Sequence, residues 1–159
     1  MAESPPVSNL FTKLHTWKGK KPQENFVTDS LVYVLQYLLH HESKEGRELF
    51  GALTGQPGWL PESRCKKVTV CSQPSVKRGR PDIEISCKGR FCIYVEVKVE
   101  AQLGKDQLKR YLKALKEKKK LEEKDLDTQL VLLTKGGGAN QDEVHSVTWD
   151  KIITSLKGL

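Results

Sequence analysis

Two stretches of the chain, PDIEISC at residues 81–87 and FCIYVEVKVE at residues 91–100, decide the fold. Apolar and polar residues alternate along both, which is the pattern of a β-strand with one face on a core. Lys88 and Gly89 lie between the two stretches, and a glycine there favours a tight turn. The sequence therefore predicts an antiparallel β-hairpin.

Around this hairpin the chain alternates between helical and extended patterns. Apolar residues at helical spacing predict helices, and runs rich in β-branched residues predict strands. The expected elements are a helix from Asn25 or Thr28 to His40 or His41, a short helix around Lys44–Leu53, a strand at Lys66–Ser72, the hairpin, a helix from Lys105 to about Leu121, strands at Thr128–Thr134 and Val144–Thr148, and a small helix over Asp150–Leu156. The order predicts an α/β domain with a central mixed sheet of four to five strands flanked by helices. We expect residues 1–23 to be an N-terminal lead-in and residues 24–159 to form this domain.

The register of the hairpin decides which acidic side chains meet. A two-residue loop would put Asp82 and Glu96 on opposite faces of the sheet. We expect instead a three-residue loop at residues 87–89, with Gly89 in the left-handed region. That loop pairs Asp82 with Tyr94 and makes Glu96 a diagonal neighbour of Asp82 on the same face.

Asp82 and Glu96 together offer a set of hard oxygen ligands. Two neighbouring carboxylates repel each other unless a cation lies between them, and oxygen ligands favour Mg²⁺ or Mn²⁺. Such a metal polarises a phosphoryl oxygen and lowers the pKa of a bound water. Lys98 would hold or deprotonate the attacking water and offset charge on phosphorus, and the carbonyl of Val97 would add a ligand. The alternation alone favours a simpler reading, a solvated strand face with an ion pair between Glu96 and Lys98.

The segments GRPDIEI and YVEVKVE resemble the signature of the PD-(D/E)XK nuclease superfamily, a Pro-Asp pair followed by Glu-x-Lys on the neighbouring strand. The matching residues are Pro81-Asp82 and Glu96-Val97-Lys98, with thirteen residues between Asp82 and Glu96. The resemblance runs from Glu24 to the C-terminus. It implies a restriction-endonuclease-like core and hydrolysis of phosphodiester bonds with a divalent metal.

Three further features support the resemblance. Glu24 resembles the acidic residue of the opening helix in many members, which faces the metal site, although it equally suits the N-terminus of a helix as a favourable charge. Gln107 and Tyr111, at i and i+4, are similar to the glutamine–tyrosine motif of the RecB-like branch, which borders the active site and the DNA backbone. Tyr111 would equally pack among neighbouring leucines. VHSVTWDKIITSL at residues 144–156 resembles the strand-Trp-helix ending of bacterial members.

Basic residues predict a polyanionic partner. The formal net charge is +7, and Lys and Arg gain affinity by displacing counterions from phosphates. The segment at residues 77–80 contains three cations and comes just before Asp82, so we expect them at the same edge of the sheet. The helix that begins at Lys105 is also rich in lysine. The residues expected to contact DNA are Lys77, Arg78, Arg80, Lys105, Lys109, Gln107 and Tyr111. No pattern of base-reading side chains is visible, so sequence specificity is not expected.

The leading interpretation is a Mg²⁺- or Mn²⁺-dependent deoxyribonuclease of the endonuclease type, serving restriction, repair or antiviral defence. Its expected catalytic residues are Glu24, Asp82, Glu96 and Lys98, and its expected metal ligands are Glu24, Asp82, Glu96 and the carbonyl of Val97. Two other classes stay open: a catalytically inactive nucleic-acid-binding module that retains the nuclease fold, and a metal-free interaction domain. With no signal-like segment and no membrane-length apolar run, we expect a cytoplasmic protein. It would be either one module of a larger protein or a compact enzyme that forms a homodimer to cut both strands.

Overall fold

The computed structural model describes residues 22–99, 104, 106–122, 125–136 and 142–158. Its elements are α2 (Pro22–His41), α3 (Ser43–Thr54), the 3₁₀ helix η1 (Glu62–Lys67), β1 (Thr69–Ser72), β2 (Ile83–Cys87), β3 (Phe91–Lys98), α4 (Gln107–Glu122), β4 (Asp127–Thr134), β5 (Val144–Thr148) and α5 (Trp149–Lys157). Five strands form one sheet in the order β1-β2-β3-β4-β5. Strands β1, β2 and β3 are antiparallel neighbours, while β4 runs parallel to β3 and β5 parallel to β4. The expected α/β fold with a mixed sheet flanked by helices is confirmed.

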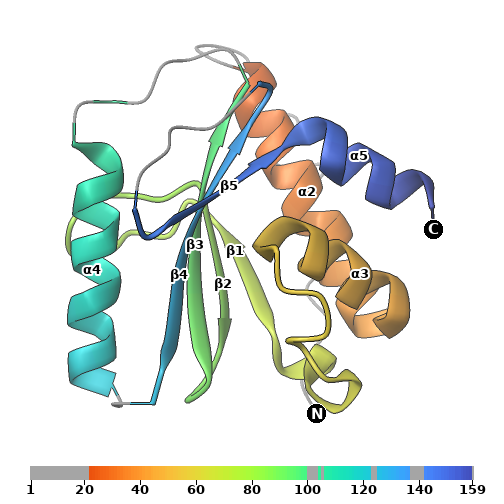
Figure 1. Ribbon diagram of the computed structural model, residues 1–159, viewed down its shortest axis with the longest axis horizontal. Helices are drawn as coiled ribbons and strands as arrows, with labels where there is room; N and C mark the ends of the chain where they lie inside the picture. Colours follow the sequence, from red (N-terminus) through yellow and green to blue (C-terminus); the bar gives the residue numbers. More distant parts are fainter. Residues whose placement is uncertain (1–21, 100–103, 105, 123–124, 137–141, 159) are drawn as a thin grey trace.

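Helices cover both faces of this sheet. The helices α2, α3 and α5 lie on one face, and α4 lies on the other (Figure 1). Each face carries its own buried apolar cluster. Strand β3 lies in the middle, and every residue from Phe91 to Val97 is buried. Packing on both faces therefore fixes β3, the most enclosed strand of the domain. Glu96 and Lys98 lie at its C-terminal end.

The position of α2 depends on its contacts with the sheet and with α3. Leu31, Leu35 and Leu39 repeat every four residues and are buried against the sheet, as helical periodicity requires. Helix α3 approaches α2 so closely that a Cβ on Gly46 would lie 2.6 Å from the backbone nitrogen of Leu39. Any larger residue at position 46 would push the two helices apart. This contact helps to set the direction of α2, whose first turn carries Glu24.

The hairpin between β2 and β3 has a register that differs from the expected one. The loop comprises residues 88–90 rather than 87–89, and Glu84 rather than Asp82 lies opposite Tyr94. The turn is closed by a bond from the N–H of Arg90 to the carbonyl of Cys87, at 3.0 Å, and Gly89, with φ 68°, occupies the middle of the loop.

The core explains this difference. Cys87 and Phe91 are both buried and face each other as the last pair of the hairpin, so a loop that included Cys87 would remove an apolar side chain from the core. The true register differs from the expected one by two residues. Since side chains alternate between faces, a shift of two keeps every side chain on its expected face.

Three element boundaries also differ from expectation. The first strand begins at Thr69 rather than Lys66, because β-branched residues begin only at Val68 and the preceding residues close the 3₁₀ helix. Helix α4 begins at Gln107, after Asp106 in the left-handed region with φ 59°. Helix α2 begins at Pro22, since a first-turn proline has no N–H to satisfy. The expected lead-in lies almost entirely in residues 1–21, outside the described ranges.

Candidate active site

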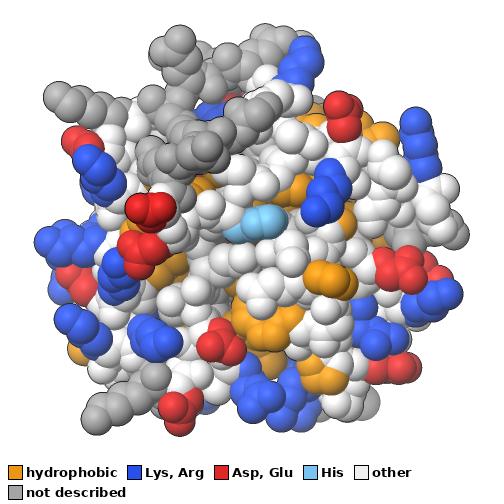
Figure 2. All heavy atoms as spheres, viewed as in Figure 1, with side chains coloured by type: hydrophobic (Ala, Val, Ile, Leu, Met, Phe, Trp, Pro, Cys, Tyr) orange, Lys and Arg blue, Asp and Glu red, His pale blue; other side chains and the backbone are white. Residues whose placement is uncertain are grey.

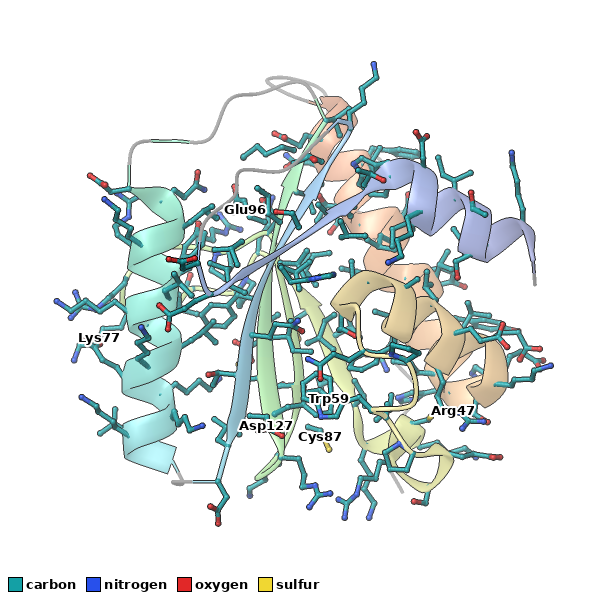
Figure 3. All side chains as sticks on the ribbon, viewed as in Figure 1. Arg47, Trp59, Lys77, Cys87, Glu96 and Asp127 are labelled. Atoms are coloured by element: carbon teal, nitrogen blue, oxygen red, sulfur yellow. The ribbon has the colours of Figure 1, made fainter. Side chains whose placement is uncertain are left out.

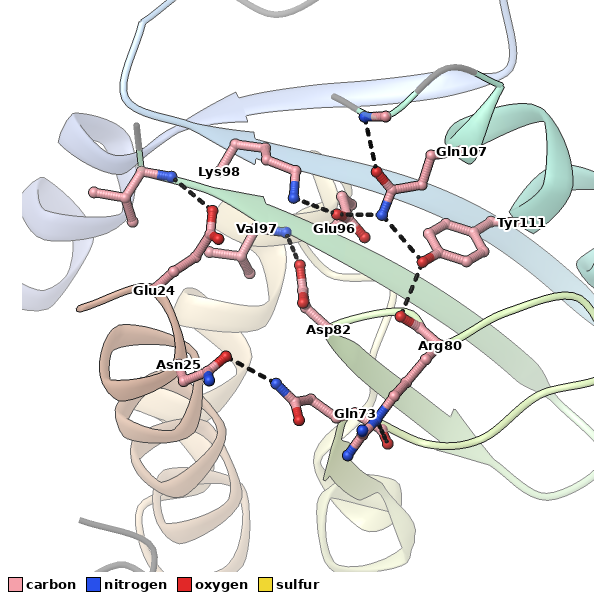
Figure 4. A network of polar contacts seen from close by, with 12 residues as sticks. Glu24, Asn25, Gln73, Arg80, Asp82, Glu96, Val97, Lys98, Gln107 and Tyr111 are labelled. Carbon is pink, nitrogen blue, oxygen red and sulfur yellow. Dashed lines mark hydrogen bonds and ion pairs between the residues drawn. The ribbon is translucent and has the colours of Figure 1, made fainter. Parts of the chain in front are cut away.

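Asp82 and Glu96 meet at the C-terminal end of β3. Asp82 directly precedes β2, and one step beyond the Ile83–Val95 pair it comes next to Glu96. The N–H of Val97 donates a hydrogen bond of 2.7 Å to Oδ2 of Asp82 (Figure 4). This bond holds the Asp82 carboxylate against the end of the neighbouring strand. The structure thus brings together the two acids that the sequence motif singled out.

Glu96 has one oxygen held by two donors and one without a partner. The Nζ of Lys98 lies 2.6 Å from its Oε1, and the amide of Gln107 donates to the same Oε1 at 2.7 Å. The residue is 1% exposed, and its Oε2 has no hydrogen-bond partner among the described residues. An unpaired buried acceptor costs roughly 1–3 kcal/mol. The Oε2 atom is therefore an available ligand inside the protein.

Burial and mutual repulsion shift the pKa values of this group. Burial, followed by the charge of Asp82, raises the pKa of Glu96 to about 7, although its contacts with Lys98 and Gln107 oppose the shift. Burial also raises the pKa of Asp82, against the effect of the Val97 N–H. For Lys98, burial lowers the pKa, but the hydrogen bond and charge of Glu96 outweigh it and raise the pKa overall. A cation beside the two carboxylates would relieve their repulsion.

Glu24 approaches this group from α2. Its Oε1 accepts a hydrogen bond of 3.3 Å from the N–H of Val99, just past the end of β3. Its charge contributes to raising the pKa of both Asp82 and Lys98. Figure 4 shows Glu24 on one side of the carboxylates and Gln107 on the other. The structure brings Glu24 to the site, and its expected roles as a catalytic residue and as a metal ligand stay predictions.

Gln107 and Tyr111 link helix α4 to the carboxylates. The amide nitrogen of Gln107 lies 3.2 Å from the hydroxyl of Tyr111 as well as contacting Glu96. The Tyr111 hydroxyl donates to the backbone carbonyl of Arg80 at 2.9 Å, while its ring is buried and meets Tyr94 edge to face at 6.4 Å. The ring of Tyr111 therefore packs in the core and its hydroxyl lies beside Gln107, while its expected contact with DNA stays a prediction.

The expected nucleic-acid-binding cations lie in different surroundings. Arg80 is exposed, and its Nε donates to the backbone carbonyl of Gln73 at 2.9 Å. Arg78 instead forms a two-pronged ion pair with Glu117 of α4. This pair and the nearby charges of Lys77 and other lysines lower the pKa of Glu117. Among the cations of this loop, Arg80 is the nearest to Asp82 in sequence. It has no acidic partner among the described residues.

The basic surface of α4 lies farther from the carboxylates. Lys77 points outward beyond α4, whereas Glu96 lies nearer the end of the sheet where α4 begins (Figure 3). Lys109 pairs with Asp106 at 3.1 Å on the surface, and Lys105 lies outside the described residues. Basic side chains over α4 alternate with acidic ones (Figure 2). The pairing of Lys109 with an acid thus favours Arg80, which has no acidic partner among the described residues, over this lysine.

Sequence reasoning missed Gln73. Its amide nitrogen donates to Oδ1 of Asn25 at 2.9 Å, its backbone carbonyl accepts from Arg80, and its N–H donates to the carbonyl of Asp82 at 2.7 Å. These contacts join segments that are far apart in the chain. No periodicity or motif spacing could have identified the residue.

Comparison with known protein families shows which family this chain belongs to. The model of the PD-(D/E)XK nuclease superfamily matches residues 9–155. The chain belongs to this superfamily. Membership implies nuclease-type activity and nucleic-acid binding in general terms, and members of the superfamily generally use divalent metals. Searches of curated proteins and of solved structures returned no significant match.

The donor atoms of this superfamily member fit a hard divalent cation. Within the described ranges, no three His, Cys, Asp or Glu side chains gather into a ready-made metal site. Mg²⁺, however, usually takes only one or two carboxylates and keeps several waters. Asp82 and Glu96, with the unpaired Oε2, match that requirement. None of the helices in the described ranges is long and apolar enough to cross a bilayer.

Proposed function

We propose that this member of the PD-(D/E)XK superfamily is an endonuclease that hydrolyses DNA phosphodiester bonds with Mg²⁺ or Mn²⁺. The observation that carries the proposal is the pairing of half-buried Asp82 with buried Glu96, in which one Glu96 oxygen is unpaired among the described residues and the other lies 2.6 Å from Nζ of Lys98. Two acids and a cation packed at the end of a buried strand cost stability unless they serve a ligand. A metal cation would suit the two acids, and a phosphate group would suit the lysine.

The metal would be held by Asp82 and Glu96. The backbone carbonyl of Val97 would add a ligand, because a residue in an antiparallel ladder directs its N–H and its carbonyl toward the same neighbouring strand, and the Val97 N–H points at Asp82. Glu24 would contribute negative charge from α2. When bound, the cation would polarise the phosphoryl oxygen and lower the pKa of a water molecule.

The remaining residues orient the reaction. Lys98, fixed by Glu96, would hold the attacking water and offset the negative charge that develops on phosphorus. Gln107 keeps Glu96 in place through its 2.7 Å hydrogen bond. Arg80 supplies an exposed cation for a phosphate near the scissile bond. Together with the net charge of +7, this arrangement suits a nucleic acid, and we propose DNA.

Several sequence-based expectations stay predictions. They are the cytoplasmic location, the homodimer or the place in a larger protein, the extent of the domain over residues 24–159, and the role in restriction, repair or antiviral defence. The contacts of Lys77, Arg78, Lys105 and Lys109 with DNA belong with them.

The test uses two circular DNA substrates and an RNA. Supercoiled plasmid, circular single-stranded DNA and an RNA of similar length are incubated with Mg²⁺, Mn²⁺ or EDTA. We expect metal-dependent cleavage of circular DNA, which only an endonuclease can open. The variants Asp82→Ala, Glu96→Ala and Lys98→Ala should lose cleavage while keeping the fold. Glu84→Gln is the matched control, since Glu84 follows Asp82 by two residues, on β2, but pairs with Lys118 at 3.4 Å.

Each alternative has its own outcome. Equal cleavage by the wild type and all three variants would refute the site. Metal-independent binding of DNA without cleavage would identify an inactive binding module. A chain that binds no nucleic acid would be an interaction domain, and cleavage of RNA alone would refute DNA as the substrate.

A further inference from the structure

Gln73 has a backbone conformation that its residue type disfavours. It directly follows β1, and its φ of 49° lies in the left-handed region. Residues other than glycine and asparagine rarely adopt this conformation. The next residue is Pro74, which restricts the backbone of Gln73 further. Such a conformation persists only where the surrounding contacts impose it, and these residues concentrate at functional sites.

Three hydrogen bonds impose it here. The N–H of Gln73 donates to the carbonyl of Asp82 at 2.7 Å. Its side-chain amide donates to Oδ1 of Asn25 on α2 at 2.9 Å, and its backbone carbonyl accepts from Nε of Arg80 at 2.9 Å. Figure 4 shows the residue between the first turn of α2 and the side chain of Arg80. Gln73 therefore joins the helix that carries Glu24 to the segment that carries Asp82.

The contact with Gln73 leaves Arg80 ready for a ligand. Arg80 is held at two points, because Tyr111 binds its backbone carbonyl and Gln73 binds its Nε. In the described part of the chain no acidic side chain pairs with its guanidinium, whereas Arg78 two residues away is bound to Glu117. A guanidinium fixed through Nε still offers its terminal amino groups as a fork for two phosphate oxygens.

We propose that Gln73 is a positioning residue that fixes the guanidinium of Arg80 at the edge of the carboxylate site to receive a phosphate of the substrate. Asn25 supports it by holding the Gln73 side chain. The identity of the ligand as a phosphodiester rests on the proposed function. The positioning of Arg80 does not depend on that function.

Two variants separate positioning from folding. Asn25→Ala removes the partner of the Gln73 amide and leaves residue 73 itself unchanged, so that one of the three bonds holding its backbone is lost. Gln73→Gly removes the amide and relieves the left-handed strain. Both should bind a fluorescent DNA duplex in EDTA about tenfold more weakly. Gln73→Gly should be no less resistant to urea than the wild type, a combination that a purely structural residue would not give. Glu143→Gly, which also relieves a positive φ, of 70°, should not weaken binding, because it only frees Lys116 from an ion pair.

A double-mutant cycle and one spectroscopic measurement decide the result. If Gln73 acts through Arg80, Gln73→Gly should not weaken DNA binding further in an Arg80→Ala background. In the metal-free protein, the Nε–H of Arg80 should exchange with water faster in Asn25→Ala and Gln73→Gly than in the wild type. Unchanged exchange in both variants would overturn the inference even if the protein cuts DNA. Faster exchange in a protein that neither binds nor cuts DNA would sink the proposed function and leave the positioning role standing.

Discussion

The amide of Gln107, on helix α4, donates to the same Oε1 atom of Glu96 that accepts from Lys98, at 2.7 Å. This shared atom connects the helix on one face of the sheet with the end of β3. It also leaves the other oxygen of Glu96 without a protein partner among the described residues. The orientation of the proposed metal ligand Glu96 is thus set by a neutral side chain from another element, as is common around metal sites.

Replacing Gln107 should weaken metal use without unfolding the protein. We expect Gln107→Ala to raise the Mg²⁺ concentration needed for half-maximal cleavage by about 10–100-fold, the range typical of residues that support metal ligands. A Mg²⁺ titration of plasmid cleavage measures this shift. The control is Gln56→Ala, at an exposed glutamine in the loop after α3. An unchanged titration curve for Gln107→Ala would show that Glu96 does not need this contact.

The stability of the metal-free protein should fall as the pH rises from 4.5 to about 7. Folding raises the pKa of Glu96 from its ordinary 4.5 to about 7, so the folded state binds a proton more tightly than the unfolded state. The stability that this proton contributes is fully present below pH 4.5 and lost as the pH rises through about 7. The raised pKa of Asp82 acts in the same direction.

Urea unfolding at several pH values measures this dependence. Glu96→Gln should flatten it, because the amide does not titrate. Added Mg²⁺ should stabilise the wild type more above pH 7 than below it, since the cation must displace the proton. A stabilising effect of Mg²⁺ that is independent of pH would contradict metal binding at Glu96.

Gly79 should be more sensitive to substitution than Gly58. Both have positive φ, of 143° and 80°. A Cβ on Gly79 would lie 3.1 Å from Cε1 of Tyr111, whereas Gly58 has nothing within 4 Å. Gly79→Ala should therefore cost the backbone strain of about 1–3 kcal/mol and also displace Tyr111, so that both stability and cleavage fall. Gly58→Ala should cost strain alone. Equal losses in urea unfolding would show that the contact with Tyr111 is unimportant.

Arg80 and Arg78 should affect DNA binding differently. Arg80→Ala should weaken binding and reduce the slope of affinity against salt concentration by about one phosphate contact. Arg78→Ala should have a smaller effect, because Arg78 is already bound to Glu117. Glu117→Gln frees Arg78 while keeping its charge, and it should bind DNA at least as tightly as the wild type. A steeper loss for Arg78→Ala than for Arg80→Ala would contradict this assignment.

The sequence predicted the fold from the helical and extended patterns along the chain, and it predicted the meeting of Asp82 with Glu96 from a three-residue turn that contains Gly89. The register was wrong by two residues, since the burial of Cys87 decides which residues form the turn and that burial cannot be read from a local pattern. Because the register differs by an even number of residues, Asp82 and Glu96 still lie on one face of the sheet.

Contacts between distant segments were beyond sequence reasoning. The basic segment at residues 77–80 looked uniform in sequence, yet in the structure Arg78 pairs with an acid of α4 while Arg80 contacts Gln73. The distinction depends on which acid the fold places beside which base. Gln73 itself has no chemical signature, and only its position between Asn25 and Arg80 marks it.

The hairpin also limits how this domain can change its length during evolution. With a three-residue turn and directly facing pairs, thirteen residues separate Asp82 from Glu96. Lengthening each strand by one residue gives fifteen and keeps the two carboxylates side by side. A single inserted residue would require a bulge, or would turn one carboxylate to the opposite face. Viable insertions and deletions in this hairpin should therefore come in pairs, a parity rule that a library of hairpin-length variants would reveal.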